Sequence, residues 1–468
     1  MAIIIKQKPA YPTFPVGQEV IFSVYNHYVV TTQQRVKYIA EVYIDENPIV
    51  PSSGVGFVGT FKTTPNGAGY GMFDLSSIIE SYVNADNMAN VSSNYKGAFA
   101  GSDPTPLHII DEYSRNKNII KYLAVVFKTE YLDTTLTPPV IVLDNDAEIS
   151  EEMKIWNGYL KETDVINTFN GDFGYLPDRF FLSSVVNIGD EPAQWLTNAP
   201  DTRYALATDY GVASLMSFPN NGVSLGKMKL TYTEDDGQIT SETVDNVYNK
   251  GGMGAYISNS DWNILHFGCY PANIYNWSST FKALVDNKTL ASYTVQGQTS
   301  AGVNITYPFT VKILCPNQKG YEPIRLTWLN QWGTWDYYTF NMKSSKSIST
   351  KGSTYQQLGG TWNESTYKPN SYKGGKKSFR VNATEKIIMN TDFVNESESE
   401  WFEELINSPE IYILNGFKTD SPGSALTTYV IPVRLQTSSY TRKTVANDKL
   451  MQYTFEVEKS KTLRTQAV

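Results

Sequence analysis

Three histidines, His27, His108 and His266, are the side chains of this chain best suited to acid–base chemistry or zinc binding near neutral pH. They lie far apart in the sequence, and none belongs to an HExxH motif or to another spacing typical of zinc ligands. We therefore interpret each of them as a structural or surface residue.

Paired carboxylates could serve a glycosidase, which needs two of them about 5–10 Å apart, or they could bind calcium. Asp235 and Asp236 lie in a predicted hairpin turn, where aspartate is a common turn former. Asp144 and Asp146 lie in the stretch LDNDAEIS, which lacks the glycine and the distal glutamate of an EF-hand loop. Neither pair indicates a site. We expect no catalytic residue, no bound metal and no cofactor, and we predict that the protein is not an enzyme.

Aromatic residues offer a different chemistry, because exposed rings bind sugars or other proteins. The stretch RLTWLNQWGTWDYYTF (residues 325–340) contains three Trp, two Tyr and one Phe around a single glycine. Its pattern predicts a hairpin with strands at 324–329 and 335–340, joined by residues 330–334, where Gly333 is free to take a positive φ. Rings on both faces of the second strand mean that both faces need cover.

A buried aromatic side chain hides about 150–250 Å² from water, and a soluble monomer normally exposes an apolar patch of only a few hundred Å². Three interpretations of the hairpin stay open: a core hairpin covered on both faces, a contact between subunits, and a platform on which a sugar stacks. Trp332, at the turn, is the candidate for glycan stacking. The candidate interface residues are Trp328, Trp332, Trp335, Tyr337 and Tyr338.

Composition indicates the elements that hold these residues. Of 468 residues, 13% are aromatic, 18% are charged and 32 are Tyr, and Tyr, Thr, Val and Ile favour strands. We predict an all-β fold with minor α structure, made of two or three β-sandwich-like domains with short capped helices. The expected capping pairs are Ser77 with Glu80 and Ser397 with Glu400.

Net charge and hydropathy exclude two classes of partner. The net charge of −8 shows no basic footprint of the kind that a nucleic-acid-binding protein carries. No stretch reaches the roughly 18–20 apolar residues of a membrane span. We expect no nucleic-acid partner and no membrane span.

The order of strand and turn signals divides the chain into three predicted domains. Residues 1–150 form an N-terminal β-rich domain with a short helix, and residues 151–315 form a middle β domain. Residues 316–468 form a C-terminal β domain that contains the aromatic hairpin and a long polar loop at 342–378.

The polar loop at 342–378 is rich in Ser, Gly, Lys and Thr and poor in aliphatic residues. Long structureless segments are uncommon inside compact domains, so we expect this one to be mobile or ordered by a partner. Its basic part, KPNSYKGGKKSFR (residues 368–380), is either a solvated loop or a contact with an acidic neighbour. We hypothesise that the loop is disordered in the free chain and ordered in an assembly.

Two cysteines, Cys269 and Cys315, are too few for a disulfide framework in a chain of this length. We expect two buried free thiols, although the sequence leaves open whether they pair. The apolar run near the N-terminus is four residues long, shorter than the about 7–15 apolar residues of a secretory signal. We therefore expect a soluble protein that is made in a cytoplasm.

Three stretches, IRLTWLNQWGTWDYYTF, WFEELINSPEIYIL and YVIPVRLQTSSYTRKTVANDKLMQYTFEVEKS, resemble β-rich virion proteins of tailed bacteriophages. These are tail, baseplate or neck ring proteins of the kind found in phages that infect Bacteroidetes, and the resemblance covers mainly residues 320–468. It implies a structural subunit located in the virion, made in the host cytoplasm and assembled as a homo-oligomeric ring with other tail or neck proteins. It implies no catalytic residues.

A host-receptor recognition protein that binds surface glycans, such as an adhesin or a tailspike-like protein, would also be aromatic and β-rich. This carbohydrate-binding function stays open as the alternative, and a polysaccharide-degrading enzyme is a third. Binding to host polysaccharide would separate the binding protein from the structural subunit, and release of reducing sugar would indicate the enzyme.

Overall fold

A computed structural model of the protein describes residues 2–9, 11–85, 113–115, 119–161, 164, 168–169, 172–173, 179–180, 192–217, 225–246, 263–314, 320–415, 430–437, 439–441 and 451–464. Among them strands predominate and helices are few and short, so the predicted all-β fold with minor helix is confirmed. His108 and Cys315 lie outside the described residues.

The chain divides into two compact units. The first contains Met1–Ile313 together with Leu329–Asp336, and the second contains Leu314–Trp328 together with Tyr337–Val468. The short insertion Leu329–Asp336 is the connecting turn of the aromatic hairpin with its flanking residues, so the hairpin contributes residues to both units. A further division of the first unit at residue 150 stays a prediction.

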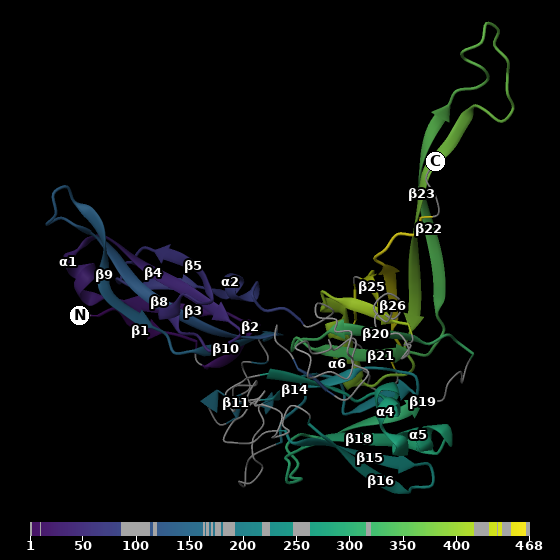
Figure 1. Cartoon of the computed structure of the whole chain (residues 1–468), viewed down its shortest axis with the longest axis horizontal. Coiled ribbons are helices and arrows are strands. Elements are labelled where there is room, and N and C mark those ends of the chain that lie inside the picture. The colour runs from purple at the N-terminus through teal and green to yellow at the C-terminus, as the bar shows by residue number, and fades with distance from the viewer. Residues whose placement is uncertain are drawn as a thin grey trace. The chain divides into compact units, whose positions relative to one another are not determined.

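The N-terminal part of the first unit is a β-sandwich of two sheets (Figure 1). The smaller sheet has the order β1 (Ile4–Gln7), β3 (Ile21–Tyr25) and β6 (Gly71–Asp74). The larger sheet has the order β2 (Thr13–Gly17), β10 (Met153–Tyr159), β8 (Ile120–Asp133), β4 (Gln34–Asp45) and β5 (Phe57–Thr63), and β9 (Val140–Ile149) also pairs with β8.

Alternating side chains of the two sheets fill a common core. Phe127 of β8 meets Phe22 of β3 at a ring-centroid distance of 5.4 Å and Phe73 of β6 at 5.7 Å. Strand β10 pairs with β8 and with β2, although it follows residue 150, where the sequence predicts the end of the first domain. The sheet therefore extends to residue 159.

Two α-helices and a 3-10 turn, η1 (Pro51–Ser53), connect these strands. Helix α1 (His27–Thr32) begins at Asn26, whose side chain accepts from the Val29 amide. Helix α2 (Ser76–Glu80) begins without a side-chain cap at Leu75, so the predicted capping box of Ser77 and Glu80 is wrong. The reason is that Asp74 accepts from both the amide and the hydroxyl of Ser76, which starts the helix earlier.

The rest of the first unit contains further sheets. A five-stranded sheet has the order β13 (Thr202–Leu206), β19 (Phe309–Leu314), β18 (Leu290–Gln298), β15 (Lys227–Glu234) and β16 (Ile239–Asp245). A three-stranded sheet has the order β14 (Val212–Ser217), β17 (Asn263–Gly268) and β7 (Tyr113–Arg115), and β11 (Thr168–Phe169) pairs with β12 (Asp172–Phe173).

Helices α4 (Pro271–Trp277) and α5 (Ser279–Asp286) follow β17. Phe281 of α5 packs on Tyr232 of β15 and Tyr293 of β18, with ring centroids 5.4 Å from each. Helix α5 therefore covers one face of the five-stranded sheet, as Figure 1 shows. The predicted hairpin turn at Asp236-Gly237 joins β15 to β16, and Gly237 has a φ of 87°.

The second unit is built on one seven-stranded sheet. Its order is β21 (Trp335–Phe340), β20 (Ile324–Leu329), β24 (Ile411–Leu414), β25 (Val430–Leu435), β26 (Thr454–Lys459), β23 (Gly375–Asn390) and β22 (Ser345–Gln357). Helix α6 (Glu396–Asn407) packs on one face of this sheet, where Phe402 meets Phe455 of β26 at 5.4 Å.

The cap of α6 differs from the predicted pair Ser397 and Glu400. The Asn395 side chain accepts from the Glu398 amide, and the Glu398 carboxylate accepts from the Asn395 amide. Asn is as good a cap as Ser, and this register leaves Trp401 and Phe402 buried against the sheet.

The prediction that residues 342–378 form one long loop is wrong in part, because strands form toward both ends of this segment. Residues 345–357 form β22 and residues 375–378 begin β23; the two strands pair from Ser345 with Ile388 to Gln357 with Gly375, and residues 358–374 connect them. Most side chains of these paired segments are polar on both faces, so their sequences lack the alternation of apolar and polar residues that predicts a strand. The strands form all the same, because pairing through backbone hydrogen bonds does not require that alternation. Figure 1 shows a ribbon that continues past the other strands of its sheet.

Candidate functional site

The aromatic hairpin has the predicted strands, and Gly333 in its turn has a φ of 75°. Asn330 stabilises the turn, because its side-chain oxygen accepts from the amides of Trp332 and Thr334. Four of the five candidate interface residues are at most 4% exposed, and the fifth, Tyr338, is half-buried; the four are Trp328, Trp332, Trp335 and Tyr337.

Trp332 lies within the first unit and has no exposed face. Its ring packs on Phe180 at a centroid distance of 4.7 Å, and the Arg179 guanidinium lies 5.4 Å from the ring centroid. Its Nε1 donates to Oδ1 of Asn198 at 3.0 Å. A sugar could not stack on this ring, so the structure contradicts the interpretation of Trp332 as a glycan platform.

Helix α6 covers one face of the hairpin strands within the second unit. Trp328 lies 4.8 Å from the Trp401 ring, and Tyr338 meets Phe402 edge-on at 4.9 Å. On the other face, the Arg325 guanidinium lies 5.1 Å from the Tyr337 ring centroid. The need for cover on both faces was a correct inference, but no second subunit is required to provide it.

The two described histidines do not form a reactive site. His266 is buried, and its Nδ1 lies 2.8 Å from the Ser214 hydroxyl. Burial lowers the pKa of His266 to about 3, so the ring is neutral and a weak base near neutral pH. His27 is exposed, and its Nδ1 lies 3.0 Å from the Tyr25 hydroxyl.

The acidic candidates serve local structure. Asp236 accepts from the Gln238 amide in its turn, and Asp144 accepts from the Asn26 side chain. In the part of the chain that the structure describes, no three His, Cys, Asp or Glu residues gather as a metal site would require. The Cys269 side chain is buried.

Residues 222–226 read GVSLG and match the G-x-S-x-G spacing of a nucleophile elbow, a catalytic signature. Such an elbow needs a helix directly after the serine turn. Here a strand follows instead, since β15 begins at Lys227 and the Gly226 amide donates to the Gln298 carbonyl. Ser224 lies outside the described residues, and the setting of an elbow is missing.

A cavity of about 730 Å³ in the first unit is lined by Glu19, Asp74, Glu80, Tyr159 and Lys161 among others. Asp74 is engaged by Ser76, and the hydrogen bonds lower its pKa. Among the described lining residues, no buried nucleophile or base lies beside these carboxylates, so the lining does not indicate a particular reaction.

The surface that stands out is the β22–β23 arm, which we define as residues 345–385. Tyr372, Trp362 and Leu358 are 70%, 78% and 74% exposed, and Tyr367 is exposed as well. Rings of this size are normally covered in a soluble chain. The sequence offers a signal for this surface, because Trp362, Tyr367 and Tyr372 occur in a segment with few aliphatic residues to pack on. The sequence analysis chose its candidate interface aromatics from the buried hairpin, although it also expected residues 342–378 to meet a partner.

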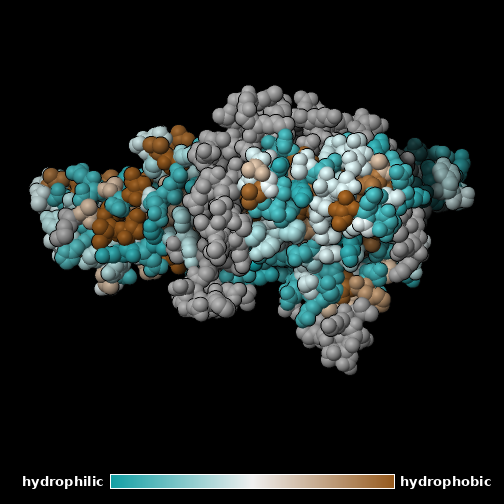
Figure 2. Space-filling model, turned by 90° about the horizontal axis from the view of Figure 1, so that it is seen from below, coloured by the Kyte–Doolittle hydropathy of each residue, from teal (hydrophilic) through white to brown (hydrophobic). Residues whose placement is uncertain are grey.

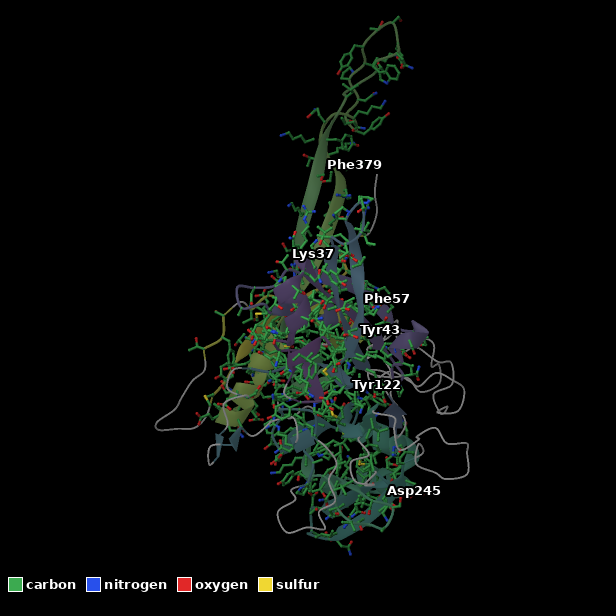
Figure 3. All side chains as sticks on the ribbon, turned by 90° about the vertical axis from the view of Figure 1, so that its left-hand side faces the viewer. Lys37, Tyr43, Phe57, Tyr122, Asp245 and Phe379 are labelled. Atoms are coloured by element: carbon green, nitrogen blue, oxygen red, sulfur yellow. The ribbon has the colours of Figure 1, made fainter. Side chains whose placement is uncertain are left out.

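The arm is also basic. Its residues, 345–385, carry seven basic side chains and two acidic ones, in a chain whose net charge is −8. Figure 3 shows side chains that project from the arm on both sides, with Phe379 labelled on it. The tip is ordered by its own contacts, since the Thr361 amide donates to the Lys368 carbonyl and Lys368 pairs with Glu364 at 3.1 Å.

The backbone of the arm has free edges. Among the described strands, β22 pairs with β23 alone. Strand β23 pairs with β26 only from Lys386 to Asn390, and beyond that its one further partner among these residues is a bridge from Ala383 to Leu463. Unpaired edge groups can bind another strand. The arm therefore combines apolar rings, positive charge and unpaired backbone groups.

Comparisons with known proteins do not assign this chain to a family. No protein-family model matches the chain, and no curated protein matches it. A solved structure of trypsin-activated alpha-2-macroglobulin from Escherichia coli aligns with 97% of this chain and 23% of that one, at 10% identity and a TM-score of 0.18. A TM-score this low carries no argument about fold or function. In the described residues, no helix has the length and apolar character to cross a membrane.

Proposed function

We propose that this chain is a structural subunit of a phage virion, a component of a tail, baseplate or neck ring. It assembles with copies of itself and with neighbouring tail proteins. The observation that supports this proposal is the exposed aromatic and basic β22–β23 arm, which has no core of its own to cover it. The resemblance of residues 320–468 to tailed-phage virion proteins supports it independently.

The arm replaces the aromatic hairpin as the contact surface in this proposal. Interfaces favour Trp, Tyr and Arg at their centre, and the arm carries Trp362, Tyr367 and Tyr372 in exposed positions. The hairpin residues are buried already, and they hold the fold rather than a partner.

Immunoelectron microscopy of phage particles tests the proposal. Antibodies against the purified chain are applied to particles from a culture in which the gene is expressed, with the major capsid protein labelled as a positive control. Label on the tail, baseplate or neck is the expected result. Label in the lysate but none on purified particles would show that the chain is not a virion subunit.

A glycan-binding receptor protein is the second candidate, and the exposed rings of the arm tip now favour it in place of Trp332. A sugar could stack on Trp362, which is 78% exposed. A glycan array with the wild type, Trp362→Ala and Trp332→Ala separates the residues. Binding that is lost only in Trp362→Ala supports this function, and no binding by the wild type excludes it for the glycans on the array.

A further inference from the structure

The first unit carries a second exposed ribbon, formed by β9 and the part of β8 that pairs with it. Strand β9 pairs with β8 alone among the described strands, so its outer edge is unpaired over ten residues. Four apolar side chains of β9 are each about half exposed: Val140 47%, Ile141 48%, Leu143 52% and Ile149 53%. Long apolar edge strands are usually protected from other strands.

Figure 2 shows apolar residues gathered on the N-terminal part of the first unit, at the left of the view. No partner among the described residues covers the outer side chains of β9, because they are exposed in the complete structure. An apolar edge that is free in one chain is a site where a strand can be added.

The β8–β9 ribbon is acidic, whereas the arm is basic. Residues 126–149, which form this ribbon, contain five acidic side chains and one basic one, Lys128. Glu130 and Glu151 pair with lysines of the same unit, whereas Asp146 is exposed and Glu148 is partly exposed. The net charge is therefore −4 over the β8–β9 ribbon, residues 126–149, and +5 over the arm, residues 345–385.

We infer that the β22–β23 arm of one copy of this chain docks on the free edge of β9 of another copy. The unpaired edge of β22 forms backbone hydrogen bonds with the unpaired edge of β9; β22 is thirteen residues long and β9 is ten. The exposed Ile348 and Phe379 of the arm bring apolar surface to the apolar side chains of β9. The lysines of the arm meet Asp146 and Glu148, and opposite charges on adjacent strands stabilise such pairs.

This contact is head-to-tail, because arm and edge are different surfaces of the same chain. Each copy can then give its arm to one neighbour and receive the arm of another, which produces a closed ring or an open filament. The inference rests on the proposed function only in that copies of the chain assemble with one another.

Reciprocal charge reversal tests this contact. The arm variant is Lys351→Glu with Lys376→Glu, and the edge variant is Asp146→Lys with Glu148→Lys. The control is Lys288→Glu with Lys312→Glu, which changes the net charge as the arm variant does at exposed sites elsewhere. Sedimentation velocity at low and high salt measures the association of each protein and of an equal mixture of the arm and edge variants.

In the expected result, the wild type and the control associate at low salt and dissociate as salt rises, since salt screens exposed charges. Each variant alone associates at least about tenfold more weakly, because like charges then face each other. The mixture recovers association, since each contact in an alternating assembly again joins opposite charges. A symmetric contact between two arms would leave the edge variant unaffected, and one between two edges would leave the arm variant unaffected.

Three results of the sedimentation experiment would overturn the inference. They are a wild type of single-chain mass at every concentration, an arm or edge variant that associates like the wild type, and a mixture that does not recover. If the wild type instead binds RNA or anionic vesicles through the arm and the arm variant does not, the arm serves a different partner and the inference fails. Label on phage particles would still support the proposed function in each case, because the arm could then contact another tail protein.

Discussion

Trp332 packs its indole on the ring of Phe180, with the centroids 4.7 Å apart, in the interior of the first unit. Both residues belong to a buried cluster that also contains Trp156, Leu196 and Ile264. The contact joins the turn of the aromatic hairpin to segments that are distant in the sequence. Trp332 is a core residue of this unit and not a ligand-binding one.

Replacing Trp332 by Ala is expected to lower the free energy of unfolding by about 3–5 kcal/mol, because a large buried ring leaves a cavity. Urea unfolding measures the change. The matched control is Trp362→Ala, which removes an exposed ring and should change stability by less than about 0.5 kcal/mol. Equal stability of the two variants would contradict the placement of Trp332 in the core.

Gly333 is expected to tolerate no side chain. A Cβ at this position would lie 1.7 Å from the Asn157 carbonyl oxygen, and the φ of 75° is unfavourable for other residues. Gly333→Ala should therefore cost more than the about 1–2 kcal/mol of a left-handed residue alone, with about 1–3 kcal/mol added by overpacking.

Gly237→Ala is the control for that prediction, since Gly237 has a φ of 87° and a Cβ added there would have no atom within 4 Å. Gly237→Ala should lose only the stability that a positive φ costs a residue with a side chain. Thermal unfolding of both variants gives the comparison, and a Gly333→Ala variant as stable as Gly237→Ala would mean that the turn does not pack against Asn157.

Asn395 is expected to be the cap of α6. Asn395→Ala removes the acceptor of the Glu398 amide and should lower the free energy of unfolding by about 1 kcal/mol. Ser397→Ala should cost less, because the Ser397 hydroxyl only donates to the Asn395 side chain. Urea unfolding of both variants distinguishes this register from one in which Ser397 is the cap.

His266 is expected to make the protein less stable in mild acid. Its pKa is about 3 in the folded chain and about 6.5 when unfolded, so the unfolded state alone takes up a proton between these values. The contribution of neutral His266 to the free energy of unfolding is fully present above pH 6.5. It declines by up to about 1.4 kcal/mol per pH unit as the pH falls toward 3.

The control for this pH dependence is His266→Asn, whose side-chain oxygen can still accept from the Ser214 hydroxyl but does not titrate. Unfolding at pH 7.5, 6 and 5 should show a steeper loss for the wild type than for the variant. Parallel curves for the two proteins would mean that His266 is accessible to protons in the folded state.

The sequence by itself determined the type of local structure where polar and apolar residues alternate or a turn signal is strong. The strands of the aromatic hairpin and the Asp236-Gly237 turn follow from such signals, because they depend on residues that are neighbours in the chain. Caps were harder to place. Asp74 and Asn395 take the place of Ser77 and Ser397, since several polar residues near a helix start can each accept the first free amides.

Only the tertiary structure decided which surfaces are free. The spacing of the hairpin rings shows that they must be buried. Phe180 and α6 bury them from segments that are distant in the sequence, and a local sequence pattern cannot predict such contacts. The polar arm is the converse case. Its polar and basic composition already indicated a contact with a partner, but its strands carry no alternation to reveal them. Only the pairing of β22 with β23 showed that its rings are exposed without a core.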